Sequence, residues 1–255
     1  MLDSQSFKNG IIYKGDAYEV LKQLDSNVIE VCVTSPPYNL NIDQDSSEPT
    51  SKTAFAFSEK YKEWYDDRMD EYMYQGYQKA VMHELIRVCK SSVFYNHKIR
   101  YAWHSRNKHK TLCRTLDPYQ WLQDFPIWCH IIWDRCGIGH PHNRYHIQSE
   151  MIYQIKKPRK WDNKYGLTNI WRIPPSRNNG HVCSFPDQLV YNCLDPTTTK
   201  GDTIIDPFLG SGTVALVAMQ KELKFVGIER DQRYFDLACQ RVRQLEETGI
   251  QGSLF

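Results

Sequence analysis

The segment Thr34-Ser35-Pro36-Pro37-Tyr38 carries residue types that could hold an amino group for transfer chemistry. The Ser35 hydroxyl oxygen and the Pro36 carbonyl oxygen can each accept one N–H bond of an amine, and the two prolines fix φ and hold the carbonyls rigidly. The exocyclic amine of a nucleobase is a poor nucleophile until it becomes tetrahedral, which two such acceptors favour. Tyr38 could stack on a base removed from its helix. A Ser-Pro-Pro turn that only ends a strand is the alternative interpretation.

A second segment, 206–213, reads Asp-Pro-Phe-Leu-Gly-Ser-Gly-Thr and has the residues of a ligand-binding turn. Gly210, Gly212 and Ala215 match the pattern G-x-G-x-x-G/A between an expected strand and an expected helix, where glycines let the backbone turn tightly and approach a ligand. Glu229 ends the next expected strand, 23 residues after the start of this segment, from where an acid reaches a ribose hydroxyl pair. A glycine turn that merely packs a helix on a sheet is the alternative.

Short apolar runs bounded by turn residues must position these two segments. Strands are expected at 11–13, 28–33, 92–95, 127–133, 151–155, 203–205 and 225–228, and helices after Asp16 and at 72–88, 213–220 and 231–245. Only 26 residues follow Glu229, so the strands that complete a Rossmann-like sheet must come from upstream, and the sheet is expected to be circularly permuted. Asp16 then lies at the carboxyl end of a strand, where it could accept a hydrogen bond from an adenine amino group. The polar stretch 41–58 is expected to be a mobile loop.

Together the two segments resemble the amino-methyltransferases of DNA, which use S-adenosyl-L-methionine. The catalytic motif of that family, Asp/Asn/Ser-Pro-Pro-Tyr/Phe, stands here at 35–38, and the donor motif Asp-Pro-Phe-x-Gly-Ser-Gly-Thr is matched in full at 206–213. The catalytic motif comes first, as in the β-group permutation. The resemblance implies an α/β fold with a Rossmann-like, doubly wound, mostly parallel sheet, circularly permuted, and an inserted basic target-recognition region. The expected divisions are a catalytic-motif half (1–96), a target-recognition region (97–150) and a donor-binding half (151–255).

The resemblance also implies roles for individual residues. The catalytic residues would be Ser35, Pro36, Pro37 and Tyr38. The donor would be contacted by Asp16, Phe185, Asp206, Phe208, Gly210, Gly212, Thr213 and Glu229. Ser35 in place of Asp looks like the cytosine-N4 members, so N4-methylcytosine is the expected product, and adenine-N6 methylation is the alternative within the class. Direct transfer needs no covalent enzyme–base intermediate, so no cysteine is expected to be a nucleophile.

Basic residues gather between 98 and 114, where the chain has six Lys/Arg and no Asp or Glu. They are Lys98, Arg100, Arg106, Lys108, Lys110 and Arg114. Their interleaving with aromatic residues suits phosphate contact combined with stacking, and a solvated basic face is the alternative. Double-stranded DNA is the expected partner, with a cognate restriction endonuclease as a further candidate and a monomer or homodimer as the oligomeric state. The stretch 97–122 shows no clean period.

Composition limits the remaining classes. Hydrophobic residues make up 41% of the chain and charged residues 24%, as in ordinary soluble proteins. The start lacks the order of a signal peptide, and no apolar run approaches the ~20 residues of a membrane span, so a cytoplasmic location and no membrane partner are expected. The eight scattered cysteines form no C-x-x-C pair and predict no disulfide framework. The Cys and His residues between 129 and 146 fit no usual zinc spacing, so no metal is expected.

Two alternatives come from other classes of protein. A nicotinamide-dependent oxidoreductase would use the glycine turn but would give the Ser-Pro-Pro-Tyr segment no role. A non-catalytic DNA-binding protein would bind DNA and transfer nothing. Glu150, which precedes an expected strand, is either a polar strand end or a substrate contact.

Overall fold

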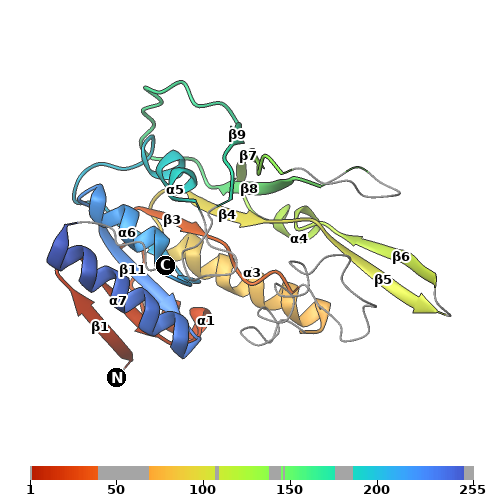
Figure 1. Cartoon of the computed structure of the whole chain (residues 1–255), viewed down its shortest axis with the longest axis horizontal. Helices are drawn as coiled ribbons and strands as arrows, with labels where there is room; N and C mark the ends of the chain where they lie inside the picture. Colours follow the sequence, from red (N-terminus) through yellow and green to blue (C-terminus); the bar gives the residue numbers. More distant parts are fainter. Residues whose placement is uncertain are drawn as a thin grey trace.

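A nine-stranded sheet forms the centre of the fold (Figure 1), and the computed structural model describes residues 2–39, 69–106, 109–137, 145, 147–175 and 186–249. The expected donor contact Phe185, the basic Lys108 and the expected loop 41–58 lie outside these described residues. The strands of the sheet are β1 (Asp3–Phe7), β2 (Gly10–Lys14), β3 (Val31–Thr34), β4 (Val93–His97), β7 (Ile127–Asp134), β8 (Ser149–Ile155), β9 (Ile170–Arg172), β10 (Thr203–Asp206) and β11 (Lys224–Glu229).

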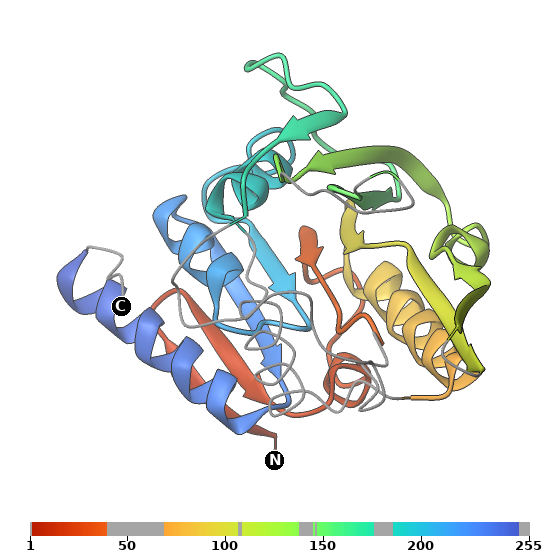
Figure 2. The same cartoon turned by 45° about the vertical axis from the view of Figure 1, so that its right-hand side comes forward.

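The strand order is β1-β2-β11-β10-β3-β4-β8-β7-β9. The C-terminal strands β11 and β10 therefore lie between the N-terminal strands β2 and β3. Five neighbouring strands of the sheet are mutually parallel, namely β2, β11, β10, β3 and β4. β1 and β8 run antiparallel to their neighbours. Figure 2 shows β11, β10 and β3 side by side in the middle of the sheet. The upstream strands therefore complete a mostly parallel sheet around β10, which confirms the expected circularly permuted α/β fold.

The central strands have both of their faces covered. Val31, Cys32 and Val33 of β3 are at most 1% exposed, and Ile204 and Ile205 of β10 are fully buried. A strand buried on both faces has no polar side to display, so it appears in the sequence as a continuous apolar run rather than as an alternation.

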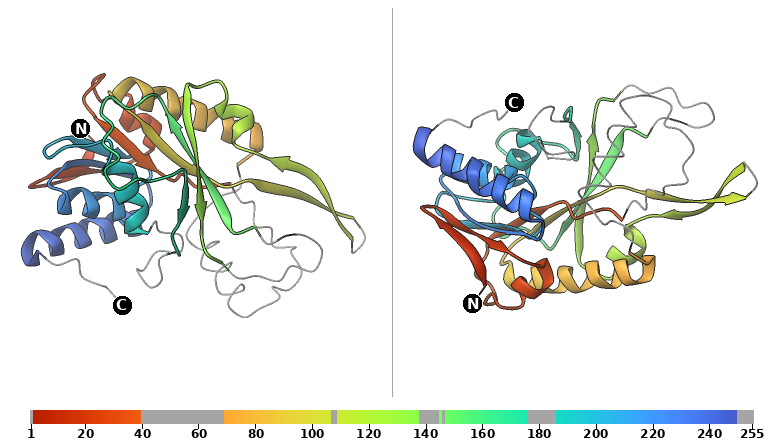
Figure 3. Two further views of the ribbon diagram at one scale, coloured as in Figure 1. Left: turned by 90° about the horizontal axis from the view of Figure 1, so that it is seen from above. Right: turned by 60° about the horizontal axis from the view of Figure 1, so that its bottom comes forward.

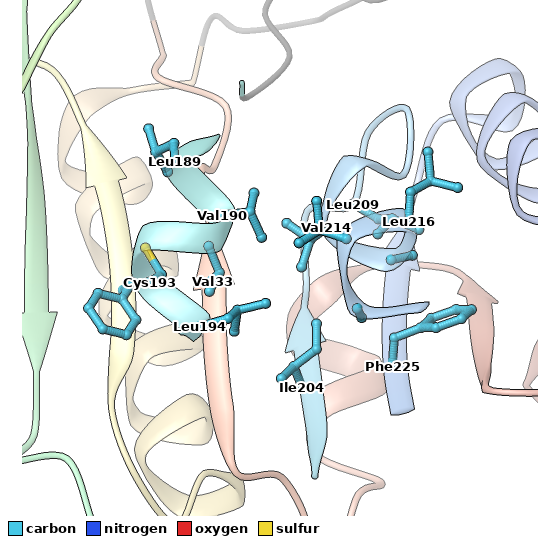
Figure 4. Packing of buried hydrophobic residues seen from close by; sticks show 14 of the residues in the cluster. Val33, Leu189, Val190, Cys193, Leu194, Ile204, Leu209, Val214, Leu216 and Phe225 are labelled. Atoms are coloured by element: carbon cyan, nitrogen blue, oxygen red, sulfur yellow. The ribbon is translucent and has the colours of Figure 1, made fainter. Parts of the chain in front are cut away.

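Two layers of helices cover the sheet, and Figure 3 shows α3 and α7 on opposite sides of it. One layer contains α5 (Asp187–Leu194), α6 (Thr213–Gln220) and α7 (Gln232–Thr248), and the other contains α1 (Ala17–Leu21), α3 (Glu71–Val88) and α4 (Tyr119–Leu122). Figure 4 shows the first layer from close by, with Cys193 and Leu194 of α5 beside Val33 of β3, and Val190 of α5 pointing toward Val214 of α6. In the parts of the chain that the structure describes, no helix is long and apolar enough to cross a membrane.

A two-stranded ribbon, β5 (Arg100–Arg106) with β6 (His109–Leu116), stands apart from the main sheet. The strands pair antiparallel from Arg100↔Leu116 to Arg106↔His109, with a register shift at Ala102/Trp103. Figures 1 and 3 show the ribbon extending away from the body of the molecule. The stretch 97–122 shows no clean period in the sequence because this bulge breaks the period of two that would otherwise reveal the strands.

Gly10 is required where β2 meets β11. A Cβ atom at Gly10 would lie 2.2 Å from the carbonyl oxygen of Phe225 and 2.6 Å from its Cγ. We expect Gly10→Ala to lower the free energy of unfolding by about 1–3 kcal/mol through this overpacking. Gly76 of α3 is the control, because a Cβ there would meet nothing within 4 Å. Gly76→Ala should raise the stability by roughly 1 kcal/mol through helix propensity. Urea unfolding measures both, and equal effects of the two substitutions would contradict this account.

Candidate active site

The two predicted motifs meet at the carboxyl ends of the adjacent parallel strands β3 and β10. Residues Val31 and Cys32 pair with Ile204 and Ile205, so the two strands end side by side. The Thr34 hydroxyl then donates a buried hydrogen bond of 2.7 Å to Oδ1 of Asp206. Because Ser35 follows Thr34 directly, this bond holds the start of one motif against the start of the other.

Polar groups converge around the Tyr38 hydroxyl. Its oxygen lies 2.8 Å from Ser35 Oγ, 2.7 Å from Asn96 Oδ1 and 2.9 Å from Glu150 Oε2. Ser35 Oγ is also 3.4 Å from Asn96 Oδ1. The other carboxylate oxygen of Glu150 accepts from Arg135 Nη1 at 2.8 Å. The catalytic motif therefore lies inside a cluster of hydrogen-bond acceptors, which is the environment that an amine with two N–H groups requires.

Asn96, which no sequence motif indicates, and Glu150, which the sequence presents as either a strand end or a substrate contact, both lie in this cluster. Asn96 is 1% exposed, and its Nδ2 donates to the Met151 carbonyl at 3.0 Å, so its Oδ1 is oriented toward the motif. Glu150 is 7% exposed and stands in β8, the antiparallel neighbour of β4. The rule that parallel strands bind ligands at their carboxyl ends could have indicated Asn96, whereas Glu150 needs the β4–β8 register.

Tyr74 and His97 support the motif from the side of α3. The Tyr74 hydroxyl is 2.8 Å from the Pro37 carbonyl oxygen and 2.7 Å from His97 Nε2. The rings of His97 and Tyr38 lie with centroids 4.6 Å apart at 33°. Burial, and then the charge of Arg100, lowers the pKa of His97 to about 3. His97 is therefore neutral at physiological pH and serves as a packing and hydrogen-bonding partner.

The glycine turn of the donor motif is tied to the end of β11. The Gly210 amide donates to Glu229 Oε2 at 2.8 Å, and the Asp231 amide donates to Oε1 at 2.7 Å. Gly210 and Gly212 have φ values of 54° and 89°, in the left-handed region that glycine adopts without strain. A Cβ on Gly212 would also come within 3.2 Å of Ala238 Cβ on α7. Glu229 thus shapes the turn. Each of its carboxylate oxygens keeps a second lone pair that could accept from a ribose hydroxyl, so the expected ribose contact stays a prediction.

Two buried hydroxyls in this turn fit a bound donor. Ser211 Oγ and Thr213 Oγ1 have no hydrogen-bond partner among the described residues, and both residues are at most 4% exposed. A buried hydroxyl without a partner is costly, and a carboxylate group would accept from both of them. The residues present therefore suit the carboxylate end of S-adenosyl-L-methionine. Phe208 is half-buried in the same turn, and its amide donates to Asp206 Oδ1 at 3.0 Å.

Asp16 lies on the next strand end, as expected. β2 runs parallel to β11, and the Gly15 amide donates to the Glu229 carbonyl at 3.0 Å. The Asp16 carboxylate caps α1 by accepting from the Glu19 amide at 3.2 Å and accepts from the Tyr77 hydroxyl at 2.8 Å. Tyr77 belongs to α3, so the helix that supports the amine motif also reaches the donor side.

The predicted phosphate contacts fall into different environments. Lys98 Nζ lies 5.6 Å from the centroid of the Tyr38 ring, at the catalytic motif itself. Arg106, Lys110 and Arg114 are on the strands of the β5–β6 ribbon. Arg100 is only 5% exposed and forms an ion pair with Glu71. This burial argues against the expected phosphate contact at Arg100, because its guanidinium is held inside the protein by the half-buried carboxylate of Glu71.

The cysteine nearest the Ser-Pro-Pro-Tyr motif lies in the core. Cys32 is completely buried in β3, and burial raises the pKa of its thiol well above the ordinary value. Within the described ranges, no group of three His, Cys, Asp or Glu side chains could hold a metal ion together. His140, His142 and His146 lie outside those ranges.

A family model and a curated relative both match most of the chain. The family model described as DNA methylase, of the N6/N4 methyltransferase type, matches residues 29–240. The type II methyltransferase M.Cfr9I of Citrobacter freundii is 26% identical over 279 aligned residues, which cover 94% of this chain and 89% of that protein.

Solved structures share the fold. The PvuII DNA methyltransferase (cytosine-N4-specific) superposes with a TM-score of 0.68 at 17% identity, covering 95% of this chain and 93% of that chain. The protein TTHA0409 of Thermus thermophilus, complexed with S-adenosyl-L-methionine, superposes with a TM-score of 0.65 at 20% identity, covering 94% of this chain and 95% of that chain.

The buried carboxyl of Asp206 predicts a pH dependence of stability. Burial raises its pKa to about 7, and the charge of Glu229 acts in the same direction. In the unfolded chain the pKa is about 3.9. The folded protein therefore retains a proton that the unfolded chain loses, and stability falls as pH rises from about 4 to 7, by up to ~1.4 kcal/mol per pH unit.

Asp206→Asn should flatten this fall, because Asn still accepts from the Thr34 hydroxyl but does not titrate. Urea unfolding of both proteins at pH 5 and pH 8 measures the effect. The stability of the variant relative to the native chain should increase between the two pH values. A difference that stays constant would show that Asp206 has an ordinary pKa.

Proposed function

The chain belongs to the N6/N4 family of DNA methylases, and from this membership we propose that it transfers a methyl group from S-adenosyl-L-methionine to the N4 amine of a flipped-out cytosine in double-stranded DNA. The observation that carries the proposal is the 2.7 Å hydrogen bond between Thr34 and Asp206. It joins the segment suited to holding an amine to the segment suited to holding the donor, so that both open at one edge of the sheet.

S-adenosyl-L-methionine, when bound, would supply an electrophilic methyl group on a sulfonium centre. Ser211 and Thr213 would donate to its carboxylate, because their buried hydroxyls have no partner among the described residues. Glu229 and Asp16, on neighbouring strand ends, would contact the ribose and the adenine. Asp206, Phe208, Gly210 and Gly212 would shape this pocket, and Phe185 would lie near the methionine end. The TTHA0409 complex with S-adenosyl-L-methionine, which shares the fold, supports this cofactor.

On the amine side the residues act by position. Ser35 Oγ and the Pro36 carbonyl would accept the two N–H bonds of the amine and favour its tetrahedral form. Pro37 would hold the backbone rigid, and Tyr38 would stack on the flipped base. The Glu150 carboxylate, 2.9 Å from the Tyr38 hydroxyl, could take up the proton that the methylated amine releases. No cysteine takes part.

Cytosine is favoured over adenine by the residue at the first motif position. Ser35 stands where other members of the family carry Asp or Asn, and this Ser resembles the cytosine-N4 members. The PvuII enzyme, whose fold this chain shares, is described as cytosine-N4-specific. Adenine-N6 methylation would use the same acceptors and is the alternative outcome of the test below.

Duplex DNA would be bound by the region 97–150, which includes the β5–β6 ribbon. The proposed phosphate contacts are Lys98, Arg106, Lys108, Lys110 and Arg114. A two-stranded ribbon has the width that the major groove of B-DNA admits. M.Cfr9I is a type II methyltransferase, and we propose that this chain likewise acts in the cytoplasm beside a cognate restriction endonuclease, as a monomer or homodimer.

The decisive experiment measures methyl transfer from labelled S-adenosyl-L-methionine to mixed-sequence DNA, followed by digestion and identification of the modified nucleoside by mass. We expect N4-methylcytosine. N6-methyladenine would keep the mechanism and overturn the base assignment. Donor binding without transfer to any DNA would favour a non-catalytic DNA-binding protein, and binding of NAD in place of the donor would favour an oxidoreductase.

Substitutions within β3 and the motif distinguish positioning from covalent catalysis. Ser35→Ala removes one acceptor from the amine and should lower kcat by about 100-fold or more. Cys32→Ala, three residues earlier and fully buried, should keep most of the activity. Steady-state methyl transfer measures both, with donor binding as the control for folding. An inactive Cys32→Ala protein that still binds the donor would contradict the proposed chemistry.

A further inference from the structure

Arg100 lies at the root of the β5–β6 ribbon but points into the protein. Its Nη1 and Nη2 atoms donate to the two carboxylate oxygens of Glu71, each at 2.7 Å. This is a bidentate ion pair, the strongest geometry available to a guanidinium and a carboxylate. Burial raises the pKa of Glu71, but the hydrogen bonds from Arg100 and Gln75 outweigh it, so that the net pKa is below the ordinary value. Glu71 is therefore charged at neutral pH.

The same guanidinium holds the residue that follows Tyr38. Arg100 Nη1 donates to the Asn39 carbonyl at 3.2 Å, and Asn39 Nδ2 lies 3.4 Å from Glu71 Oε2. Asn39 has a φ of 51°, which is uncommon for a residue with a side chain, and it is 5% exposed. Its side chain also exchanges two hydrogen bonds of 2.9 Å with the backbone of Met69. The ion pair thus holds Asn39, the residue directly after the catalytic motif, in an unusual backbone conformation.

One turn further along α3, the same cluster reaches the other neighbour of Tyr38. The Arg100 guanidinium carbon lies 4.9 Å from the centroid of the Tyr74 ring. The hydroxyl of that ring is 2.8 Å from the Pro37 carbonyl. Pro37 and Asn39 bracket Tyr38, so the residues immediately before and after it are both held by this cluster.

We propose that Arg100 and Glu71 are positioning residues for the amine-binding motif, linking it to the root of the β5–β6 ribbon. The inference rests on the proposed function. Misplacing reacting groups by about 1 Å can cost ~100-fold in rate, so a motif released at Pro37 and Asn39 would lose turnover. Arg100 thereby differs in kind from the basic residues of the ribbon: it shapes the site and adds nothing to the attraction of DNA.

The test combines turnover with the salt dependence of DNA binding in Arg100→Gln and Glu71→Gln. We expect each variant to lose about 100-fold in kcat at saturating donor and DNA, with the slope of log K against log[salt] unchanged. Arg106→Gln, in a proposed phosphate contact, should reduce that slope by about 1. Lys79→Gln removes an exposed ion pair with Asp124 from the same helix and should change neither quantity.

If the inference is wrong, the two single substitutions should have opposite effects on DNA binding. Were Arg100 a phosphate contact, Arg100→Gln would weaken DNA binding and reduce the slope, whereas Glu71→Gln would release Arg100 and tighten DNA binding. Parallel losses of kcat in both variants support the positioning role. Normal kcat in both variants, or opposite effects on DNA binding, would overturn it.

Removing one partner leaves an uncompensated buried charge that could unfold the protein. The double variant Arg100→Gln/Glu71→Gln removes both charges and should fold. Because the pair acts as a unit, its loss of kcat should match that of either single variant rather than their product. A folded double variant with native kcat would refute the inference.

A second readout does not depend on transfer activity. Hydrogen–deuterium exchange of the peptide 34–39 should be at least about ten times faster in the double variant than in the native chain and unchanged in Lys79→Gln, because an unpinned segment opens more often. A native chain with no transfer activity would overturn the proposed function, and the exchange rates would still decide whether the ion pair holds the motif. Equal exchange rates in all three proteins would show that it does not.

Discussion

The hydrogen bond from Thr34 to Asp206 joins residues 172 positions apart and fixes the separation between the two halves of the site. It is buried, and it forms only because β3 and β10 are adjacent parallel strands in the register that pairs Val31 with Ile204. A slip of this register by one residue would turn every side chain of β3 to the other face of the sheet. The position of the Ser-Pro-Pro-Tyr motif relative to the glycine turn is therefore a property of the sheet, and the loops that follow the two strands start from it.

Two buried acidic side chains shape the loops on the side of the glycine turn. Glu229 accepts from the amides of Gly210 and Asp231, and Asp206 accepts from the Thr34 hydroxyl and from the Phe208 amide. Each side chain thus replaces hydrogen bonds that the bent backbone of a loop cannot make with itself. The site is preorganised by these contacts, so that the cost of ordering the loops is met during folding and not during binding.

Much of this arrangement could be predicted from the sequence. The strands β3, β10 and β11 are short apolar runs ended by turn residues, and the spacing of the glycines indicates the turn. The β5–β6 ribbon could not be predicted because a bulge interrupts the alternation of its residues. The strand β9 could not be predicted because it has only three residues. The burial of Arg100 could not be predicted, because a run of basic residues carries no information on which member is buried. Asn96 has no spacing motif, since its role depends on the end of β4 lying beside β3.

The helix α3 touches both halves of the site with side chains three residues apart. The Tyr74 hydroxyl is 2.8 Å from the Pro37 carbonyl, and the Tyr77 hydroxyl is 2.8 Å from Asp16. Under the proposed function, a displacement of this helix would change the contacts of both the donor and the DNA, and their binding would then be thermodynamically linked. Linkage is reciprocal. If the bound donor raised the affinity of the protein for DNA, bound DNA would raise the affinity for the donor by the same factor. One helix would then make the occupancy of each site depend on the concentrations of both ligands.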